Sequence, residues 1–276
     1  MTNEKTTHQI VIGDSTKMSN IKDGSVDLIV TSPPYPMIEM WDEMFNLAGA
    51  KTYAEMHDYL AKTWKECFRV LKQGGLMCIN IGDATRRIDH RFKLYPNHSQ
   101  VIEKCEMMGF ETLPYILWQK PTNKPNAFLG SGFLPPNAYV TLDCEFILIF
   151  RKDGLRHFEP KHEDRYLSAF TKEERDVWFS QIWTIKGSTQ NNKNIDRRTA
   201  EYPEEIVERL IRMFSIIGDT VLDPFLGTGT TTGVSKRLNR NSIGYEIDKS
   251  LIPLIKEKVG YAQVSLTTNS EVQIIG

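Results

Sequence analysis

The segment from Thr220 to Glu246 constrains the fold more than any other part of the chain. An apolar run ends at Leu222, the loop 223–231 follows with two glycines, and a helical stretch continues to about Leu238. A second strand is expected over Ser242 to Tyr245, and Glu246 closes it. A strand, a tight glycine-containing turn, a helix and a second strand make a βαβ unit, in which both strands lie parallel in one sheet. The sequence therefore predicts a parallel sheet covered by helices.

Short apolar runs and stretches of helical spacing alternate along the rest of the chain. Runs bounded by turn residues are typical of buried strands, and apolar positions recurring every three or four residues are typical of helices. The expected strands are Ile10 to Ile12, Val26 to Val30, Leu76 to Ile81, Leu113 to Trp118 and Glu145 to Phe150. The expected helices are Tyr53 to Leu71, stopped by Gly74-Gly75, then Ser99 to Met108, Tyr202 to Phe214 and Leu251 to Val259. This alternation predicts an α/β fold with a doubly wound sheet, helices on both faces, and ligands at the carboxyl ends of the strands.

The bulk composition fits one large domain with an inserted or appended lobe. The chain has 276 residues, 40% of them hydrophobic, and a net charge of -1, so any surface for nucleic acid must be a local basic patch. The stretch Met1 to Gln9 is polar and no long apolar run is present, so a cytoplasmic protein is expected. The cysteines show no zinc or redox spacing and are expected to be buried free thiols: Cys67, Cys78, Cys105 and Cys144.

Glu246 and the glycine loop before it form the first candidate binding site. Glycines let the backbone approach a ligand, and a carboxylate at the end of the next strand accepts hydrogen bonds from both ribose hydroxyls. The loop is not a P-loop, because no Lys follows its glycines. A tight strand-to-helix turn alone would also require glycine. The added carboxylate favours a nucleoside site.

The second candidate site is the sequence Thr31-Ser-Pro-Pro-Tyr35, at the end of the strand expected over Val26 to Val30. Two consecutive prolines stiffen the loop and remove two N–H donors, which leaves it rich in acceptors. The Ser32 hydroxyl and the Pro33 carbonyl suit the two N–H groups of an aromatic amino group, and Tyr35 offers a face on which a base stacks. The alternative is a rigid proline turn with a buried tyrosine.

At this point the sequence resembles the β class of DNA amino-methyltransferases, in which a Ser/Asp/Asn-Pro-Pro-aromatic motif precedes the cofactor motif. The resemblance extends over most of the chain and keeps the order of motifs of the family. It includes Gly13-Asp14, Ser25 to Ile29, Phe68 to Gly75, Ile116 to Lys120, Glu145 to Leu148, Tyr202 to Glu205 with Leu210-Ile211, and Asp223 to Thr231.

The resemblance implies a Rossmann-like methyltransferase sheet, S-adenosylmethionine as cofactor and double-stranded DNA as substrate. Ser32, Pro33, Pro34 and Tyr35 would hold the target base, Glu246 the ribose of the cofactor, and Asp14 would lie near its adenine. The remaining residues expected to line the cofactor are Asp223, Phe225, Gly227, Thr228, Gly229 and Thr230. A companion restriction endonuclease acting separately and a homodimer stay open.

The expected reaction is direct transfer of the methyl group to the exocyclic amino nitrogen of a flipped-out base. Relatives with Ser at the first position of the motif usually methylate cytosine N4, whereas Asp or Asn is more usual for adenine N6. The resemblance therefore favours cytosine N4, with adenine N6 as the alternative. An RNA or protein-amide methyltransferase and a catalytically inactive DNA-binding module are further alternatives. Carbon-5 methylation would need a Cys nucleophile in or beside a Pro-rich turn, and deamination would need a His/Cys/Cys zinc signature. The sequence shows neither feature.

We expect residues 1–150 to form the catalytic half of the methyltransferase domain, 151–200 a target-recognition region, 201–264 the cofactor-binding half and 265–276 a fraying tail. The segment Pro36 to Phe45 would be either a lid over the base or a helix packed on the core. A basic cluster follows the strand ending at Ile81, with a solvated charged loop as the alternative reading: Arg86, Arg87, His90, Arg91 and Lys93. The main DNA-reading surface is expected among Lys186, Asn191, Asn192, Lys193, Arg197 and Arg198.

Overall fold

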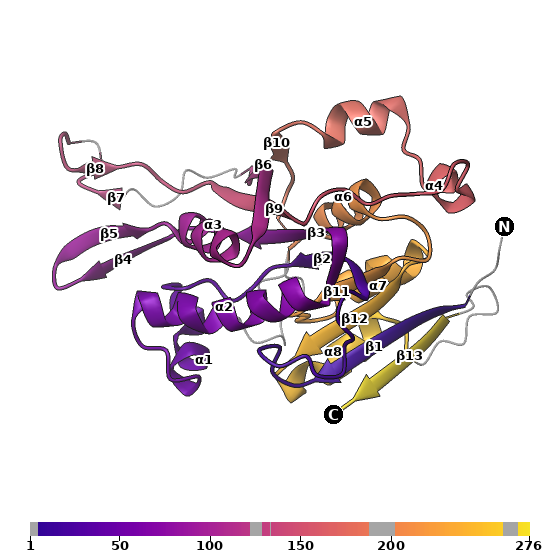
Figure 1. Ribbon diagram of the computed structural model, residues 1–276. Coiled ribbons are helices and arrows are strands. Elements are labelled where there is room, and N and C mark those ends of the chain that lie inside the picture. The colour runs from indigo at the N-terminus through magenta and orange to yellow at the C-terminus, as the bar shows by residue number, and fades with distance from the viewer. Residues whose placement is uncertain (1–4, 122–128, 133, 188–201, 262–269) are drawn as a thin grey trace.

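A nine-stranded sheet with the order β10-β6-β9-β3-β2-β11-β12-β1-β13 organises the described part of the chain (Figure 1). The computed structural model describes residues 5–121, 129–132, 134–187, 202–261 and 270–276. Neighbouring strands are parallel, except that β9 runs antiparallel to both β3 and β6. The strands are β1 (Thr6–Ile12), β2 (Val26–Thr31), β3 (Leu71–Ile81), β6 (Phe110–Gln119), β9 (Cys144–Lys152), β10 (Ile182–Thr184), β11 (Thr220–Asp223), β12 (Asn241–Glu246) and β13 (Ser270–Ile275).

Helices cover both faces of this sheet, which confirms the expected doubly wound α/β fold. Successive residues of β2 face opposite sides, so Ile29 packs in one apolar cluster and its neighbours Leu28 and Val30 in another. The first cluster includes helices α2 (Tyr53–Val70) and α3 (Asn97–Met107). The second includes α6 (Glu204–Phe214) and α7 (Thr230–Arg237), while α8 (Ile252–Lys258) packs with β1 in a smaller third cluster.

The turn between α2 and β3 differs from the sequence expectation. Helix α2 begins with a capping box between Thr52 and Glu55, and it ends at Val70 without a glycine cap. Gly74 and its neighbour instead lie inside β3, where the register with β2 shifts. A Cβ atom at Gly74 would lie 2.3 Å from the backbone nitrogen of Arg156, so this position needs glycine for a close approach of two backbones.

The last residues form an ordered strand, so the expectation of a fraying tail was wrong for this segment. β13 pairs in parallel with β1 from Thr6 to Val11. Its side chains are mostly half-buried, and its apolar residues pack beside β1 in the third cluster. Period-two patterning over six residues at a sheet edge is too weak a signal to separate from an irregular terminus.

Residues 151–187 form short elements docked on the α6 side of the sheet. They comprise α4 (Glu163–Leu167), α5 (Lys172–Trp178) and β10, which pairs with β6. Arg212 of α6 pairs with Glu174 of α5 and lies 4.6 Å from the centroid of the Trp178 ring. Within the described residues, no helix is long and apolar enough to cross a membrane.

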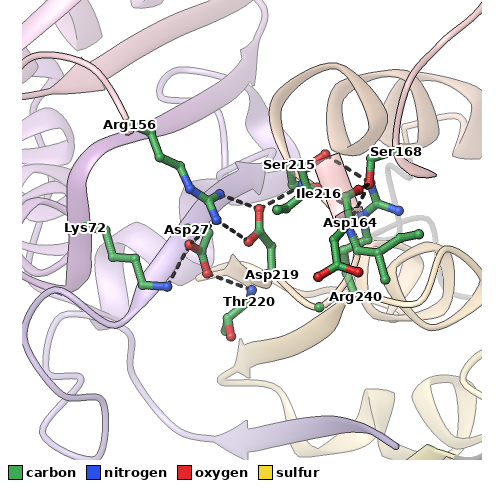
Figure 2. A network of polar contacts seen from close by, with 12 residues as sticks. Asp27, Lys72, Arg156, Asp164, Ser168, Ser215, Ile216, Asp219, Thr220 and Arg240 are labelled. Carbon is green, nitrogen blue, oxygen red and sulfur yellow. Dashed lines mark hydrogen bonds and ion pairs between the residues drawn. The ribbon is translucent and has the colours of Figure 1, made fainter. Parts of the chain in front are cut away.

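A polar network fastens the amino ends of the central strands (Figure 2). Asp27 at the start of β2 accepts hydrogen bonds from Lys72 at 2.7 Å and from the Thr220 backbone N–H at 3.0 Å. Arg156 lies between two buried carboxylates, 2.7 Å from Asp219 and 3.4 Å from Asp27. The network therefore ties β2, β3 and β11 to the segment after β9, at the sheet edge opposite the candidate site.

Candidate functional site

The predicted site residues lie at the carboxyl edge of the central strands. β2, β11, β12 and β1 are neighbours and all parallel, so their carboxyl ends meet at one edge of the sheet. β2 ends at Thr31, immediately before Ser32, whereas β11 and β12 end at Asp223 and Glu246 themselves. The structure thus brings together two motifs that are almost 200 positions apart in the chain.

Asp223 joins these two motifs directly. Its Oδ1 accepts a hydrogen bond from Thr31 Oγ1 at 2.7 Å and from the Phe225 backbone N–H at 3.0 Å, and its Oδ2 accepts one from Thr231 Oγ1 at 2.6 Å. Burial raises the pKa of Asp223 to about 6, although the three hydrogen bonds favour the charged form. This carboxylate fixes the glycine loop against the strand that carries Ser32.

The glycine loop adopts backbone conformations that other residues rarely reach. Gly227 and Gly229 have φ angles of +57° and +97°, and Gly229 is the N-cap of α7. An added Cβ at Gly227 would meet no atom within 4 Å, so the loop has open space on that side. The side chains of Thr228 and Thr230 are buried and accept hydrogen bonds from Lys258 of α8, at 3.3 and 2.8 Å.

Glu246 is a buried carboxylate at the end of β12, with 8% of its surface exposed. It accepts hydrogen bonds from the backbone N–H groups of Gly227 and Asp248, both at 2.8 Å. Burial raises the pKa of Glu246 to about 7. Each oxygen keeps a lone pair for a further donor, so the carboxylate can accept two hydroxyl groups of a ligand.

Asp14 and Phe225 follow β1 and β11, the strands on either side of the strand that carries Glu246. The backbone N–H of Gly13 donates to the Glu246 carbonyl at 2.8 Å, which places the exposed Asp14 immediately beyond the paired ends of β1 and β12. Burial raises the pKa of Tyr59 in α2 to about 12, and the nearby Asp14 acts in the same direction. The Phe225 ring lies edge-on to Trp64 at a centroid distance of 5.8 Å.

Ser32 and Tyr35 are half-buried, whereas Pro33 and Pro34 between them are buried. Ser32 Oγ lies 3.1 Å from Tyr35 Oη. The Tyr35 hydroxyl donates to Glu145 Oε2 at 2.8 Å, and burial together with the Glu145 charge holds the pKa of Tyr35 well above its usual value. The ring is therefore anchored through its hydroxyl.

Sequence reasoning missed three residues that surround the Tyr35 hydroxyl. Asn80 Nδ2 donates to Tyr35 Oη and to Glu145 Oε2, both at 2.7 Å. Lys120 forms an ion pair with the other oxygen of Glu145. These residues come from β3, β9 and the end of β6. The antiparallel register that brings them together cannot be predicted from any one of these segments alone. The available signal was a charged residue, Glu145, at the head of an apolar run.

A buried amide holds the loop that follows Tyr35. Asn97 Nδ2 donates to the carbonyls of Pro36 and Gly82, both at 3.0 Å, and Asn97 Oδ1 lies 3.1 Å from His57 Nε2. Burial lowers the pKa of His57 to about 4, so the ring is neutral and donates to the amide. The loop is thereby fixed to β3 and α2.

The segment Pro36 to Phe45 packs on the core, as the helix alternative expected. Its turn Glu39–Trp41 leads into α1 (Asp42–Leu47), whose Phe45 is fully buried. Arg86 holds Asp42 through two hydrogen bonds of 2.9 and 3.0 Å.

The predicted basic cluster forms a β-hairpin of β4 (Ala84–Ile88) and β5 (Arg91–Tyr95). Its two-residue turn, Asp89-His90, has positive φ at both positions, which matches the twist of a hairpin. Figure 1 shows this hairpin beside the pair β7 (Leu129–Gly130) and β8 (Ala138–Tyr139), and Phe92 stacks on Tyr139 at 4.7 Å. The side chains of Arg87, Arg91 and Lys93 are exposed.

Of the expected DNA-reading residues in 151–200, Lys186 lies within the described part of the chain. The others lie outside the described residues: Asn191, Asn192, Lys193, Arg197 and Arg198. The buried cysteines are Cys67, Cys78 and Cys105, as expected, whereas Cys144 is partly exposed.

The family model for DNA methylases of the N6/N4 type matches residues 26–257. The chain belongs to this family. The order of its two motifs, Ser32 to Tyr35 before Asp223 to Thr231, is that of the β class of amino-methyltransferases, and its likeness to Type II methyltransferases makes it one of the restriction–modification type. This confirms the resemblance seen in the sequence.

Two archaeal relatives resemble this DNA methylase along most of their length. It is 60% identical to the Type II methyltransferase M.MjaI of Methanocaldococcus jannaschii, over 98% of this chain and 97% of the relative. It is 49% identical to the Type II methyltransferase M.MthZI of Methanothermobacter thermautotrophicus, over 92% of this chain and 77% of the relative.

Solved structures of DNA methylases share the fold. A putative DNA modification methylase from Thermus thermophilus, complexed with S-adenosyl-L-methionine, is 31% identical with a TM-score of 0.76, over 98% of this chain and 100% of that one. The PvuII DNA methyltransferase, described as cytosine-N4-specific, has a TM-score of 0.68 at 20% identity, over 92% and 86% of the two chains. At that identity the likeness shows the fold alone.

Proposed function

We propose that this DNA methylase transfers the methyl group of S-adenosylmethionine to N4 of cytosine in double-stranded DNA. The coarser activity, S-adenosylmethionine-dependent methylation of a DNA amino group, follows from its family. The choice of cytosine rests on Ser32, a hydroxyl acceptor at the end of β2 where adenine-modifying relatives more often carry a carboxylate or carboxamide.

The residues around Glu246 fit the methyl donor. The buried carboxylate keeps lone pairs for two ribose hydroxyls, and the open side of Gly227 leaves room for a ligand to approach the backbone. S-adenosylmethionine supplies an electrophilic sulfonium methyl group when bound. We assign Asp14, Phe225 and the loop through Thr230 to the same site, with the buried Asp223 holding its shape.

Ser32 and Pro33 would prepare the target nitrogen. The lone pair of an aromatic amino group is delocalised into the ring, and two hydrogen-bond acceptors localise it for attack. Ser32 Oγ takes one N–H and the Pro33 carbonyl takes the other, while the anchored Tyr35 ring stacks on the flipped base. Direct transfer requires no covalent enzyme intermediate.

Transfer of a labelled methyl group tests the substrate class. The enzyme is incubated with labelled S-adenosylmethionine and with duplex DNA, RNA or a protein mixture in separate reactions. We expect incorporation into duplex DNA alone. Incorporation into RNA or protein without DNA would contradict the proposal, and binding of S-adenosylmethionine without any transfer would favour an inactive DNA-binding module.

A further inference from the structure

A chain of hydrogen bonds leads from Ser32 to a charged carboxylate on the far side of Tyr35. Ser32 Oγ lies 3.1 Å from Tyr35 Oη, and Tyr35 Oη lies 2.8 Å from Glu145 Oε2. Only 14% of the Glu145 side chain is exposed, and Lys120 balances its charge. Glycine at position 82 leaves room for this arrangement, because a Cβ there would lie 3.1 Å from the Tyr35 ring and 3.2 Å from Glu145 Cγ.

The partners of Tyr35 fix the direction of every bond in this chain. The Asn80 amide must present its NH2 group here, since its oxygen would otherwise lie 2.7 Å from a carboxylate oxygen. Tyr35 Oη therefore accepts from Asn80 and donates to Glu145, which as a carboxylate only accepts. The remaining lone pair of Tyr35 Oη is the acceptor for the Ser32 proton.

This direction determines what Ser32 offers to a substrate. With its own proton pointing at Tyr35, the Ser32 oxygen has only lone pairs left for other partners. A hydroxyl free to rotate could point either its proton or a lone pair at the substrate. Pointing the proton at an incoming N–H group would oppose binding of that group. Glu145, two hydrogen bonds away from Ser32, fixes the direction of the Ser32 proton.

We propose that Glu145, acting through Tyr35, fixes the Ser32 hydroxyl as an acceptor for the target amino group and receives the proton which that group loses. This inference rests on the proposed function. It makes Glu145 a positioning residue and the final proton acceptor, and it explains a charged residue inserted among the apolar residues of β9.

The proton balance of the step is simple. The amino nitrogen forms a bond to the methyl carbon as the bond from that carbon to sulfur breaks, and the nitrogen then carries a positive charge and one proton too many. That proton moves to Ser32 Oγ, the Ser32 proton moves to Tyr35 Oη, and the Tyr35 proton moves to Glu145 Oε2. The product becomes neutral, Glu145 becomes neutral, and it later returns its proton to water.

Single-turnover methyl transfer to duplex DNA, measured against pH at saturating S-adenosylmethionine, tests this relay. We expect Glu145→Gln to lower the transfer rate about 100-fold, in line with the loss of a proton acceptor, and to change the dependence of that rate on pH. Tyr35→Phe, which keeps the ring and breaks the chain, should cost a similar factor. The double variant should be no slower than the slower single variant, because both changes remove one unit.

Glu111→Gln is the matched control, because Glu111 carries a surface ion pair with Arg151 on the neighbouring strand β9. It should leave the rate and the pH profile unchanged. Wild-type transfer with an unaltered rate and profile in Glu145→Gln would overturn the relay and leave the proposed function standing. Additive losses in the double variant, with the wild-type pH profile retained, would reduce Glu145 to a structural role and also overturn the relay. If the wild-type enzyme transferred no methyl group to DNA, the proposed function itself would fail.

Discussion

At the scale of single residues, Glu246 is the carboxylate that we propose for the ribose of the cofactor, and burial makes its charge depend on pH. Its pKa is raised to about 7, so the neutral form dominates below that pH, and a neutral carboxyl accepts hydroxyl hydrogen bonds less well. The affinity for S-adenosylmethionine should therefore fall as the pH drops below about 7 and stay level above it. Calorimetric titration from about pH 6 to about pH 8 measures this dependence.

The Glu246→Gln variant is the control for this prediction. It should bind S-adenosylmethionine more weakly by about 1.5–3 kcal/mol at the alkaline end of that range, because charge-assisted hydrogen bonds are lost. Its affinity should lose the dependence on pH that we assign to Glu246. Equal affinities for the two proteins at alkaline pH would remove Glu246 from the ribose site.

In the proposed function Ser32 acts on the reacting nitrogen, so its removal should lower the transfer rate more than the affinity for the cofactor. We expect Ser32→Ala to lower the single-turnover rate about 100-fold, comparable to the loss of one well-placed hydrogen-bond partner, with little change in the affinity for S-adenosylmethionine. Ser25→Ala is the control, since Ser25 donates to the Lys22 carbonyl at the other end of β2. A variant with an unchanged rate would exclude Ser32 as the acceptor.

At the level of elements, we propose the β4–β5 hairpin as a surface that contacts DNA phosphates. Arg87 and Arg91 are exposed on adjacent strands of a hairpin that extends beside β7–β8 (Figure 1). Replacing both by Gln should weaken DNA binding at low salt and reduce the slope of log affinity against log salt by about 0.9 for each lost phosphate contact. Fluorescence anisotropy with a labelled duplex measures both quantities.

Lys5 and Lys22 provide the control for the hairpin. They lie before the amino ends of β1 and β2, whereas the hairpin follows the carboxyl end of β3. Their double replacement by Gln should leave the salt slope unchanged. If both double variants behaved like the wild type, the phosphate contacts would have to lie elsewhere, such as the region 151–200 that the sequence favoured.

Individual elements also show which structural features the sequence carries and which it does not. The buried parallel strands β2, β11 and β12 were predictable, because each is a short segment with apolar residues that ends at a distinctive motif or carboxylate. Gly74 was mistaken for a helix cap, since a glycine required by the approach of Arg156 looks the same in sequence as one required by a turn. The hairpin was unpredicted as a strand pair because its residues face water on most sides and lack an apolar period.

For the whole molecule, the polar network of Figure 2 joins the two halves of the sheet. Arg156 is the cation next to the buried Asp219 and Asp27. Replacing it by Met would leave buried carboxylates without that partner, and we expect a loss of about 3 kcal/mol in the free energy of unfolding. Urea denaturation measures this loss. Arg151→Met, which breaks the more exposed pair with Glu111, should cost less than about 1 kcal/mol, and equal losses in both variants would contradict the assigned role.

The candidate site divides in a similar way. Ser32 to Tyr35 and Asp223 to Glu246 were predictable because each group is local in sequence and chemically distinctive. Asn80, Lys120 and Glu145 were not, since their meeting depends on the antiparallel placement of β9 between β3 and β6. The target base depends further on contacts to the edge of its ring, which a four-residue motif does not specify.

Identification of the methylated nucleoside tests the central claim most directly. DNA treated with the enzyme and S-adenosylmethionine is digested to nucleosides and analysed by mass spectrometry against authentic standards. The proposed function predicts N4-methylcytosine as the product, formed about 100-fold more slowly when Ser32→Ala replaces the wild type. N6-methyladenine as the sole product would contradict the cytosine assignment and leave the amino-methyltransferase standing, whereas 5-methylcytosine would contradict the proposed chemistry itself.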